Sequence, residues 1–119
     1  MVQRFDPNEA QFESYPLDPE TVLEGDPQLQ LSISWTNEDT TFMMGAMRCT
    51  PGRFQYTQSV DGTSYVLSGH IVMKGSDGSE ADCGPGTQYR WKAGAVTEYD
   101  ISGDYLEVFV AASADGVHL

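Results

Sequence analysis

The sequence predicts an all-β domain, folded as a sandwich or a barrel. From Leu29 onward, short segments of β-type residues alternate with turn residues such as those around Asn37, Gly62 and Gly84. No segment carries a helical stripe of apolar residues of useful length, and no internal repeat is visible. A length of 119 residues suits one domain with a single core.

Residues 1–28 are predicted to form an extended N-terminal arm, because prolines interrupt any regular element there after a few residues. The arm also carries large apolar side chains, namely Phe5, Phe12, Tyr15, Leu17, Val22 and Leu23. We therefore expect it to pack along the domain or along a partner subunit. Residues 29–112 are expected to form the barrel and residues 113–119 a C-terminal tail.

The expected strands follow one another through turns. In the first, residues 29–35, apolar residues at Leu29, Leu31, Ile33 and Trp35 alternate with polar ones, a period of two that buries one face. In the second, residues 41–49, Gly45 predicts a bulge or a close backbone approach. Further strands are expected at residues 53–58, 64–67, 70–74, 87–91, 95–101 and 105–111, with a bend at Ser68-Gly69 and a hairpin tip at residues 75–79.

The charge excludes some partners. With 18 acidic and 6 basic residues, the net charge of −12 repels a phosphate backbone or an anionic bilayer, so neither nucleic acid nor a membrane surface is expected as a partner. The acidic residues are spread through the chain, which is typical of a solvated surface. The sequence shows no signal-peptide core and no membrane-spanning stretch, so we expect a cytoplasmic protein. In that reducing compartment, Cys49 and Cys83 are expected to be buried free thiols.

Three segments carry a resemblance to a known family. They are Pro51-Gly-Arg-Phe-Gln-Tyr, Tyr65-Val-Leu-Ser-Gly-His-Ile-Val-Met, and Gly84-Pro-Gly-Thr followed by Ala93-Gly. In this order and spacing they resemble the small one-domain cupins of the ethanolamine-utilisation and ureidoglycine-aminohydrolase-like branch. The resemblance covers most of the chain and implies a cupin-type antiparallel β-barrel, a jelly roll, preceded by the N-terminal arm. It also implies a homodimer that pairs through sheet edges and the arm.

The resemblance further implies where a metal site would be. With Gly52 and Gly69 as the motif glycines, the family's histidine and glutamate positions fall on Tyr56, Gln58, Gly62 and Thr97. A first-row metal needs converging imidazole, carboxylate or thiolate groups, which these residues do not offer. The sequence therefore predicts neither a metal nor another cofactor, although a shifted site that uses Glu98, Glu107 or Cys83 stays open.

A pocket is expected inside the barrel. If Tyr56 and Gln58 face inward, the period of two brings further aromatic and apolar side chains to the same interior. The candidate ligand-binding residues are Met47, Arg48, Phe54, Ser64, Tyr89, Trp91, Tyr99 and Phe109. This composition is typical of a small-molecule pocket and equally of a barrel core. For Arg48 two orientations stay open: a surface cation paired with a carboxylate, or a guanidinium that points into the barrel mouth.

Two main functions fit these residues. The first is a metal-free binding module that holds a small, partly apolar organic molecule in an accessory or sensing role. The second is a cofactor-independent isomerase, lyase or cyclase with Tyr56, Gln58 and Thr97 as catalytic residues. Tyr56 would act as acid or hydrogen-bond donor, and the others would position an oxygen atom. A metal enzyme with shifted ligands is a third alternative.

Overall fold

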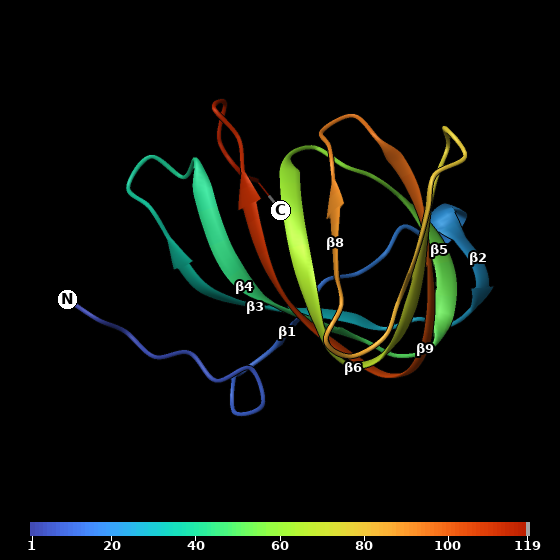
Figure 1. Ribbon diagram of the computed structural model, residues 1–119, viewed down its shortest axis with the longest axis horizontal. Coiled ribbons are helices and arrows are strands. Elements are labelled where there is room, and N and C mark those ends of the chain that lie inside the picture. Colours follow the sequence, from blue (N-terminus) through green and yellow to red (C-terminus); the bar gives the residue numbers. More distant parts are fainter. Residues whose placement is uncertain (119) are drawn as a thin grey trace.

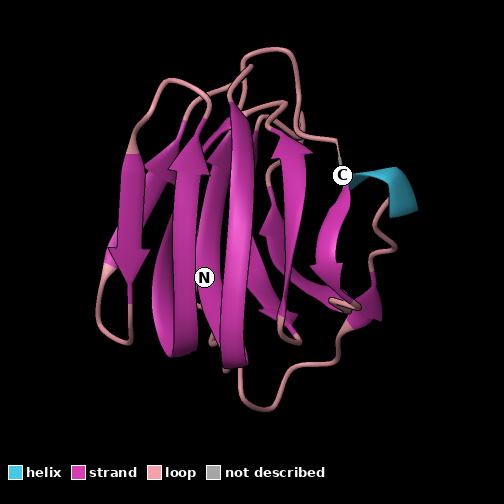
Figure 2. Ribbon diagram, turned by 90° about the vertical axis from the view of Figure 1, so that its right-hand side faces the viewer, coloured by secondary structure: helices cyan, strands magenta, loops and turns pink. Residues whose placement is uncertain are grey.

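The computed structural model describes residues 1–118, and the regular elements of this part of the chain are strands apart from one short 3-10 turn, which confirms the all-β fold. The elements in chain order are β1 (Glu13–Ser14), η1 (Pro19–Thr21), β2 (Val22–Gly25), β3 (Leu29–Thr36), β4 (Phe42–Cys49), β5 (Gly52–Thr57), β6 (Asp61–Gly75), β7 (Glu80–Cys83), β8 (Gln88–Trp91) and β9 (Val96–Ala112). The short 3-10 turn η1 lies at the edge of the strands (Figure 2). No helix in this part of the chain is long and apolar enough to cross a bilayer.

The strands form two curved antiparallel layers that face each other (Figure 1). One layer has the order β1-β3-β4-β9-β6-β8, and the other has the order β2-β5-β9-β6-β7. Strands β6 and β9 belong to both layers, because each is long enough to run through one layer, bend, and continue in the other. The core lies between the two layers.

The two long strands pair side by side and bend at the same place, and glycine makes the bend possible. Gly69 of β6 and Gly103 of β9 have φ angles of 73° and 69°, in the left-handed region. A Cβ atom at Gly69 would lie 2.7 Å from the Cα atom of Tyr105, so the two backbones touch at this point. The predicted bend at Ser68-Gly69 is confirmed, but the segments that were expected as separate strands on either side of it are one strand, β6. Likewise, the segments that were expected as separate strands at residues 95–101 and 105–111 are one strand, β9. Strand β7 was not predicted.

The predicted alternation in the first strand holds only in its first half. Leu29 is buried, but the side chains of Ile33 and Trp35 are 42% and 44% exposed. The pairing of β3 with β4 shifts register between these two residues, opposite Gly45. A Cβ atom at Gly45 would lie 2.4 Å from the carbonyl oxygen of Ser32, so the expected close backbone approach is confirmed.

The N-terminal arm adds one strand to each layer. Strand β1 pairs with β3, and β2 pairs with β5, so residues of the predicted arm form the outer edges of both layers. Tyr15 and Leu17 of the arm pack against the core. At the other end, Val117 of the predicted tail is buried, and its backbone N–H donates to the carbonyl of Thr40 over 2.6 Å. Residue 119, the last of that tail, lies outside the described residues.

The two cysteines are buried free thiols, as the sequence predicts. Cys49 lies on the inner face of β4, and Cys83 ends β7. Burial raises the pKa of Cys49 to about 12, with a smaller contribution from the Glu107 carboxyl. The Cys49 thiol therefore stays protonated near neutral pH and packs as a small apolar group.

The shared bend of β6 and β9 should be the most substitution-sensitive corner of the fold. Replacing Gly69 with alanine combines an unfavourable φ angle with a clash against the β9 backbone, so we expect a loss of about 3 kcal/mol in the free energy of unfolding. The matched control is Gly78→Ala, because Gly78 has a φ angle of 88° but no atom within 4 Å of the added Cβ, and should lose about 1 kcal/mol. Urea unfolding measures both, and equal losses would contradict the steric role of the close approach between Gly69 and the β9 backbone.

Candidate functional site

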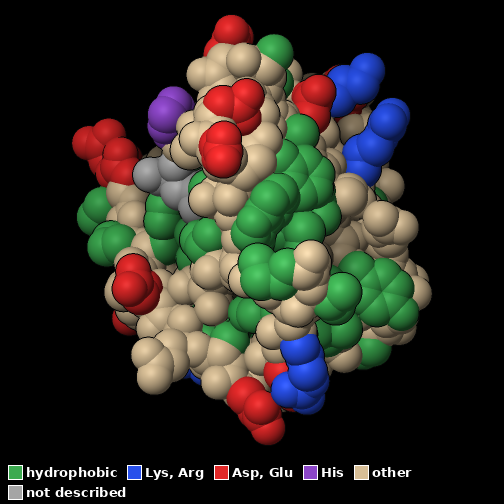
Figure 3. Space-filling model, turned by 90° about the vertical axis from the view of Figure 1, so that its left-hand side faces the viewer, with side chains coloured by type: hydrophobic (Ala, Val, Ile, Leu, Met, Phe, Trp, Pro, Cys, Tyr) green, Lys and Arg blue, Asp and Glu red, His purple; other side chains and the backbone are tan. Residues whose placement is uncertain are grey.

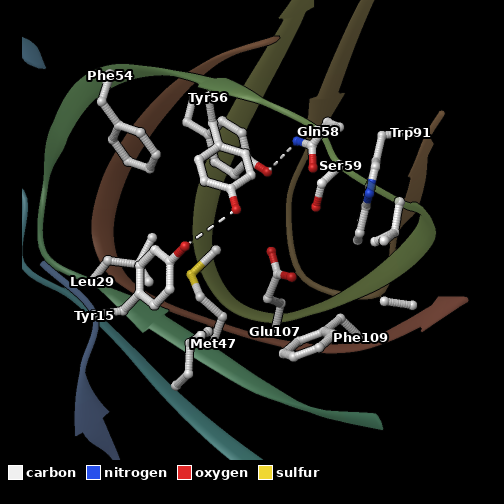
Figure 4. Close-up of a pocket in the computed structure, with 14 residues that line it drawn as sticks. Tyr15, Leu29, Met47, Phe54, Tyr56, Gln58, Ser59, Trp91, Glu107 and Phe109 are labelled. Atoms are coloured by element: carbon white, nitrogen blue, oxygen red, sulfur yellow. Dashed lines mark hydrogen bonds between the residues drawn. The ribbon is translucent and has the colours of Figure 1, made fainter. Parts of the chain in front are cut away.

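A cavity of about 90 Å³ lies between the two layers (Figure 4). Its aromatic walls are Tyr15, Phe54, Tyr56, Trp91, Tyr99 and Phe109, and its aliphatic walls are Leu29, Leu31, Met47, Val60 and Ala111. Three polar residues complete the lining, Gln58, Ser59 and Glu107. Inner positions of β4, β5 and β9 meet here because the two layers face each other, while β1 and β3 close one side with the arm residue Tyr15.

Glu107 is a carboxyl group held in the core by hydroxyl donors. Glu107 is only 3% exposed. Ser64 Oγ donates to its Oε2 atom over 2.5 Å, Tyr105 donates to Oε1 over 2.8 Å, and the Tyr89 hydroxyl also donates to Oε1. Burial raises the pKa of Glu107, and the three hydrogen bonds oppose the rise without cancelling it. No basic side chain of residues 1–118 forms an ion pair with this carboxyl.

Gln58 forms a second polar group in the cavity wall. It is 4% exposed, and its Nε2 atom donates to Thr97 Oγ1 over 3.0 Å and to the Tyr99 hydroxyl over 2.7 Å. Thr97 Oγ1 in turn donates to the backbone carbonyl of Tyr56 over 3.1 Å. These bonds hold the Gln58 amide in one place and orientation.

Tyr56 meets the N-terminal arm through its hydroxyl. The hydroxyl oxygens of Tyr15 and Tyr56 are 3.3 Å apart, and the Tyr56 ring packs edge-on against Tyr99 at a centroid distance of 6.3 Å (Figure 4). Burial first, and then the hydrogen bond to Tyr15, raise the pKa of Tyr56 to about 12. The arm thus closes one wall of the cavity with a phenol that is bonded to a site residue.

The structure brings most of the predicted site residues together. Those that line the cavity are Met47, Phe54, Tyr56, Gln58, Trp91, Tyr99 and Phe109. Three others lie behind this lining: Ser64 and Tyr89 hold the Glu107 carboxyl, and Thr97 holds the Gln58 amide. These three residues therefore orient the polar side chains of the cavity wall but do not line the cavity themselves.

Arg48 is not part of this cavity. Of the two orientations that the sequence left open, the structure has the outward one, because the inner face of β4 is formed by Met43, Met47 and Cys49. The Arg48 guanidinium donates to Gln30 over 2.5 Å, and its carbon lies 4.3 Å above the centre of the Phe12 ring. Arg48 therefore ties the N-terminal arm to the outside of the sheet.

Sequence reasoning left Glu107 open, as a ligand of a shifted metal site or, like Glu98, as a base, and it did not place Tyr15 and Tyr105 in the site. A usable signal existed for two of them, because Tyr105, Glu107 and Phe109 alternate on one strand and Phe109 was expected to face inward. Tyr15 had no such signal, since it lies in the arm and reaches the cavity only through the pairing of β1 with β3.

The residues at the family's metal positions do not fit a first-row metal. Gln58 and Thr97 are hydrogen-bonded to each other, and Gly62 offers no donor atom and lies under the Trp91 ring. Among the 118 described residues, no three histidine, cysteine, aspartate or glutamate side chains gather in a metal-binding arrangement. The carboxyl group of the cavity lining, Glu107, already accepts three hydroxyl hydrogen bonds.

The raised pKa of Glu107 predicts a pH-dependent stability. Glu107 binds its proton more tightly in the folded state, so its contribution is complete at low pH and is lost as the pH rises above its unfolded pKa, near 4.5. We therefore expect the free energy of unfolding of wild type, relative to Glu107→Gln, to fall as the pH rises above about 4.5. Urea unfolding at several pH values measures this difference. The exposed control Glu80→Gln should show no such trend, and a difference that rises with pH would contradict the sign.

Solved structures share this fold. The EutQ protein of Clostridium difficile is 17% identical, with a TM-score of 0.66 over 85% of this chain and 82% of that one. KdgF from Halomonas sp. is 13% identical, with a TM-score of 0.66 over 92% and 94% of the two chains. A Pseudomonas syringae protein of unknown function is 17% identical, with a TM-score of 0.78 over 88% of this chain and 46% of that one. At these identities the likeness shows the fold alone.

The sequence itself identifies the family. No functionally curated protein matches the chain. Residues 36–105, more than half of the 119 residues, match the EutQ-like cupin domain, which agrees with the resemblance of its corner motifs. The chain therefore belongs to the family of EutQ-like cupin domains.

Proposed function

We propose that this cupin binds a small, partly apolar organic molecule in the cavity between its two layers, without a metal, in an accessory or sensing role. One observation carries the proposal: the cavity combines empty volume with buried polar groups. An unfilled core and a buried amide or carboxyl each reduce stability. A barrel built only for stability would fill this space with aliphatic side chains, so a ligand site explains why both costs are retained.

The size of the cavity sets the size of the buried part of the ligand. An apolar cavity of about 150 Å³ holds benzene, so 90 Å³ suits a somewhat smaller group, on the scale of a five-membered ring. Ser59 is exposed and Trp91 is only partly buried, although both line the cavity. The cavity therefore reaches the surface beside them, which allows a longer ligand to extend outward.

The lining favours a neutral ligand. It contains no lysine, arginine or histidine, and its one carboxyl is Glu107 (Figure 4). An anion would enter a protein of net charge −12 and find no cation to pair with. The aromatic walls instead offer large apolar contact area.

A cofactor-independent isomerase, lyase or cyclase is the second candidate, and one observation favours it. Glu107 brings a carboxyl of raised pKa to the cavity, as a general acid or base requires. Tyr56, with a pKa of about 12, suits the role of hydrogen-bond donor better than that of proton donor. Exchange of the α-hydrogens of bound cyclopentanone in D₂O, followed by NMR, separates the two candidates. Exchange that is lost in Glu107→Gln favours the enzyme, and binding without exchange favours the binding module.

The proposal includes a homodimer. Large apolar side chains are exposed on β3 and β4, where Ile33, Trp35 and Met44 are 38% to 44% exposed. Figure 3 shows apolar side chains gathered on this side of the molecule. The edge strands β1 and β2 each have a free side, and uncovered strand edges invite pairing with another chain.

Filling the cavity should abolish binding. Ala111 lies on the inner face of β9 and is 3% exposed, so Ala111→Leu should place a larger side chain in the ligand volume. We expect it to weaken the binding of cyclopentanone, measured by NMR titration, by about tenfold or more. The matched control is Ala112→Leu, one residue along the strand and exposed, which should bind as wild type does. Equal binding by both variants would contradict the site.

A further inference from the structure

The orientation of the Gln58 amide follows from its neighbours. Thr97 has one hydroxyl proton and donates it to the backbone carbonyl of Tyr56 over 3.1 Å. Toward Gln58, which is 3.0 Å away, the Thr97 oxygen can therefore only accept, and the amide nitrogen must face it. The Oε1 atom of Gln58 then has to point the other way.

This Oε1 atom is an open acceptor inside the protein. No donor among residues 1–118 forms a hydrogen bond with it, although Gln58 is only 4% exposed. Figure 4 shows it directed into the cavity beside Ser59. The oxygen is not fully buried, so it still reaches open space in the cavity. A ligand that fills this space excludes water from the oxygen and has to supply a donor in its place.

Tyr99 offers the complementary open donor. Its hydroxyl oxygen accepts from Gln58 Nε2 over 2.7 Å, but its own proton has no acceptor among the described residues. Tyr99 lines the cavity and is 8% exposed. Burial raises its pKa far above the ordinary value, so the hydroxyl keeps its proton and can only donate further.

We propose that Gln58 and Tyr99 form a subsite for a cis amide, as found in a lactam or a primary carboxamide. The N–H of the ligand would donate to Gln58 Oε1, and its carbonyl oxygen would accept from the Tyr99 hydroxyl. The two groups are linked by the 2.7 Å bond, so they present a donor and an acceptor side by side. A ketone or an ester leaves Gln58 without a donor, and a carboxylate also brings an unpaired charge. The inference rests on the proposed binding function and specifies its ligand class.

Three probes of similar ring size test the subsite in the full-length wild-type protein. They are 2-pyrrolidinone, which has both the N–H and the carbonyl; cyclopentanone, which has only the carbonyl; and N-methyl-2-pyrrolidinone, whose N–H is replaced. Binding is measured by NMR titration. We expect 2-pyrrolidinone to bind at least about fivefold more tightly than either of the others, because only it supplies a donor to the Gln58 oxygen when it displaces water from the cavity.

Two substitutions assign this preference to residues. Gln58→Met keeps the side-chain length but removes the acceptor, and it should abolish the preference for 2-pyrrolidinone over cyclopentanone. Gln55→Met, on β5 and exposed, is the matched control and should keep the preference. Tyr99→Phe should weaken all three carbonyl probes, whereas Tyr65→Phe, on exposed Tyr65, should weaken none. Because the comparison of probes needs only wild type, a variant that fails to fold leaves the test intact.

The outcomes separate the subsite from the cavity. Equal binding of the three probes, all reduced by Ala111→Leu, would overturn the amide subsite and keep the proposed binding function. A preference for 2-pyrrolidinone that survives in Gln58→Met would overturn the role of Gln58. Absence of binding by all three probes would overturn both proposals.

Discussion

The shared bend of the paired strands β6 and β9 at Gly69 and Gly103 is the constraint on which the other features of this fold depend. Two long strands bend at one place, so a single pair of strands supplies the centre of both layers. A side chain at either glycine would collide with backbone or demand a strained φ angle. Without the double bend, β9 would be one flat strand, and its two halves could not face each other across a cavity.

The bend brings two polar groups, the Glu107 carboxyl and the Gln58 amide, to the lining of the same cavity. On one half of β9, Glu107 is enclosed by three hydroxyl donors. On the other half, Thr97 and Tyr99 hold Gln58 and leave an acceptor and a donor open toward the same space. In a core, polar groups that lack hydrogen-bond partners lower the stability of the fold. In a ligand site, the same groups can form hydrogen bonds to the ligand. The difference between the two groups is therefore the strongest structural argument for binding.

The chain keeps the corner motifs that resemble those of the family, but the positions that the resemblance assigns to metal ligands carry other residue types. The corner motifs of the cupin fold are kept, because their glycines and prolines determine where the chain turns. The positions that follow the corners are less constrained by the turns, and here they carry a tyrosine, an amide, a glycine and a threonine. Three of these contribute to one hydrogen-bonded group, in which Thr97 connects the Tyr56 backbone to the Gln58 amide. The corner motifs thus hold a hydrogen-bonded group of neutral side chains at the positions where the resemblance implies metal ligands.

Local sequence was sufficient for the fold class, for the bend at Ser68-Gly69 and for much of the cavity lining, since turn residues and a period of two act over a few neighbouring residues. Such signals cannot show that β6 and β9 continue through their bends, or that a register shift exposes Trp35. They also could not bring Tyr15 to Tyr56, or surround Glu107 with hydroxyls from β6 and β8, because these partners are far apart in the chain. Which side chains face inward is a property of each strand, whereas which of them meet is decided by how the two layers fold over each other.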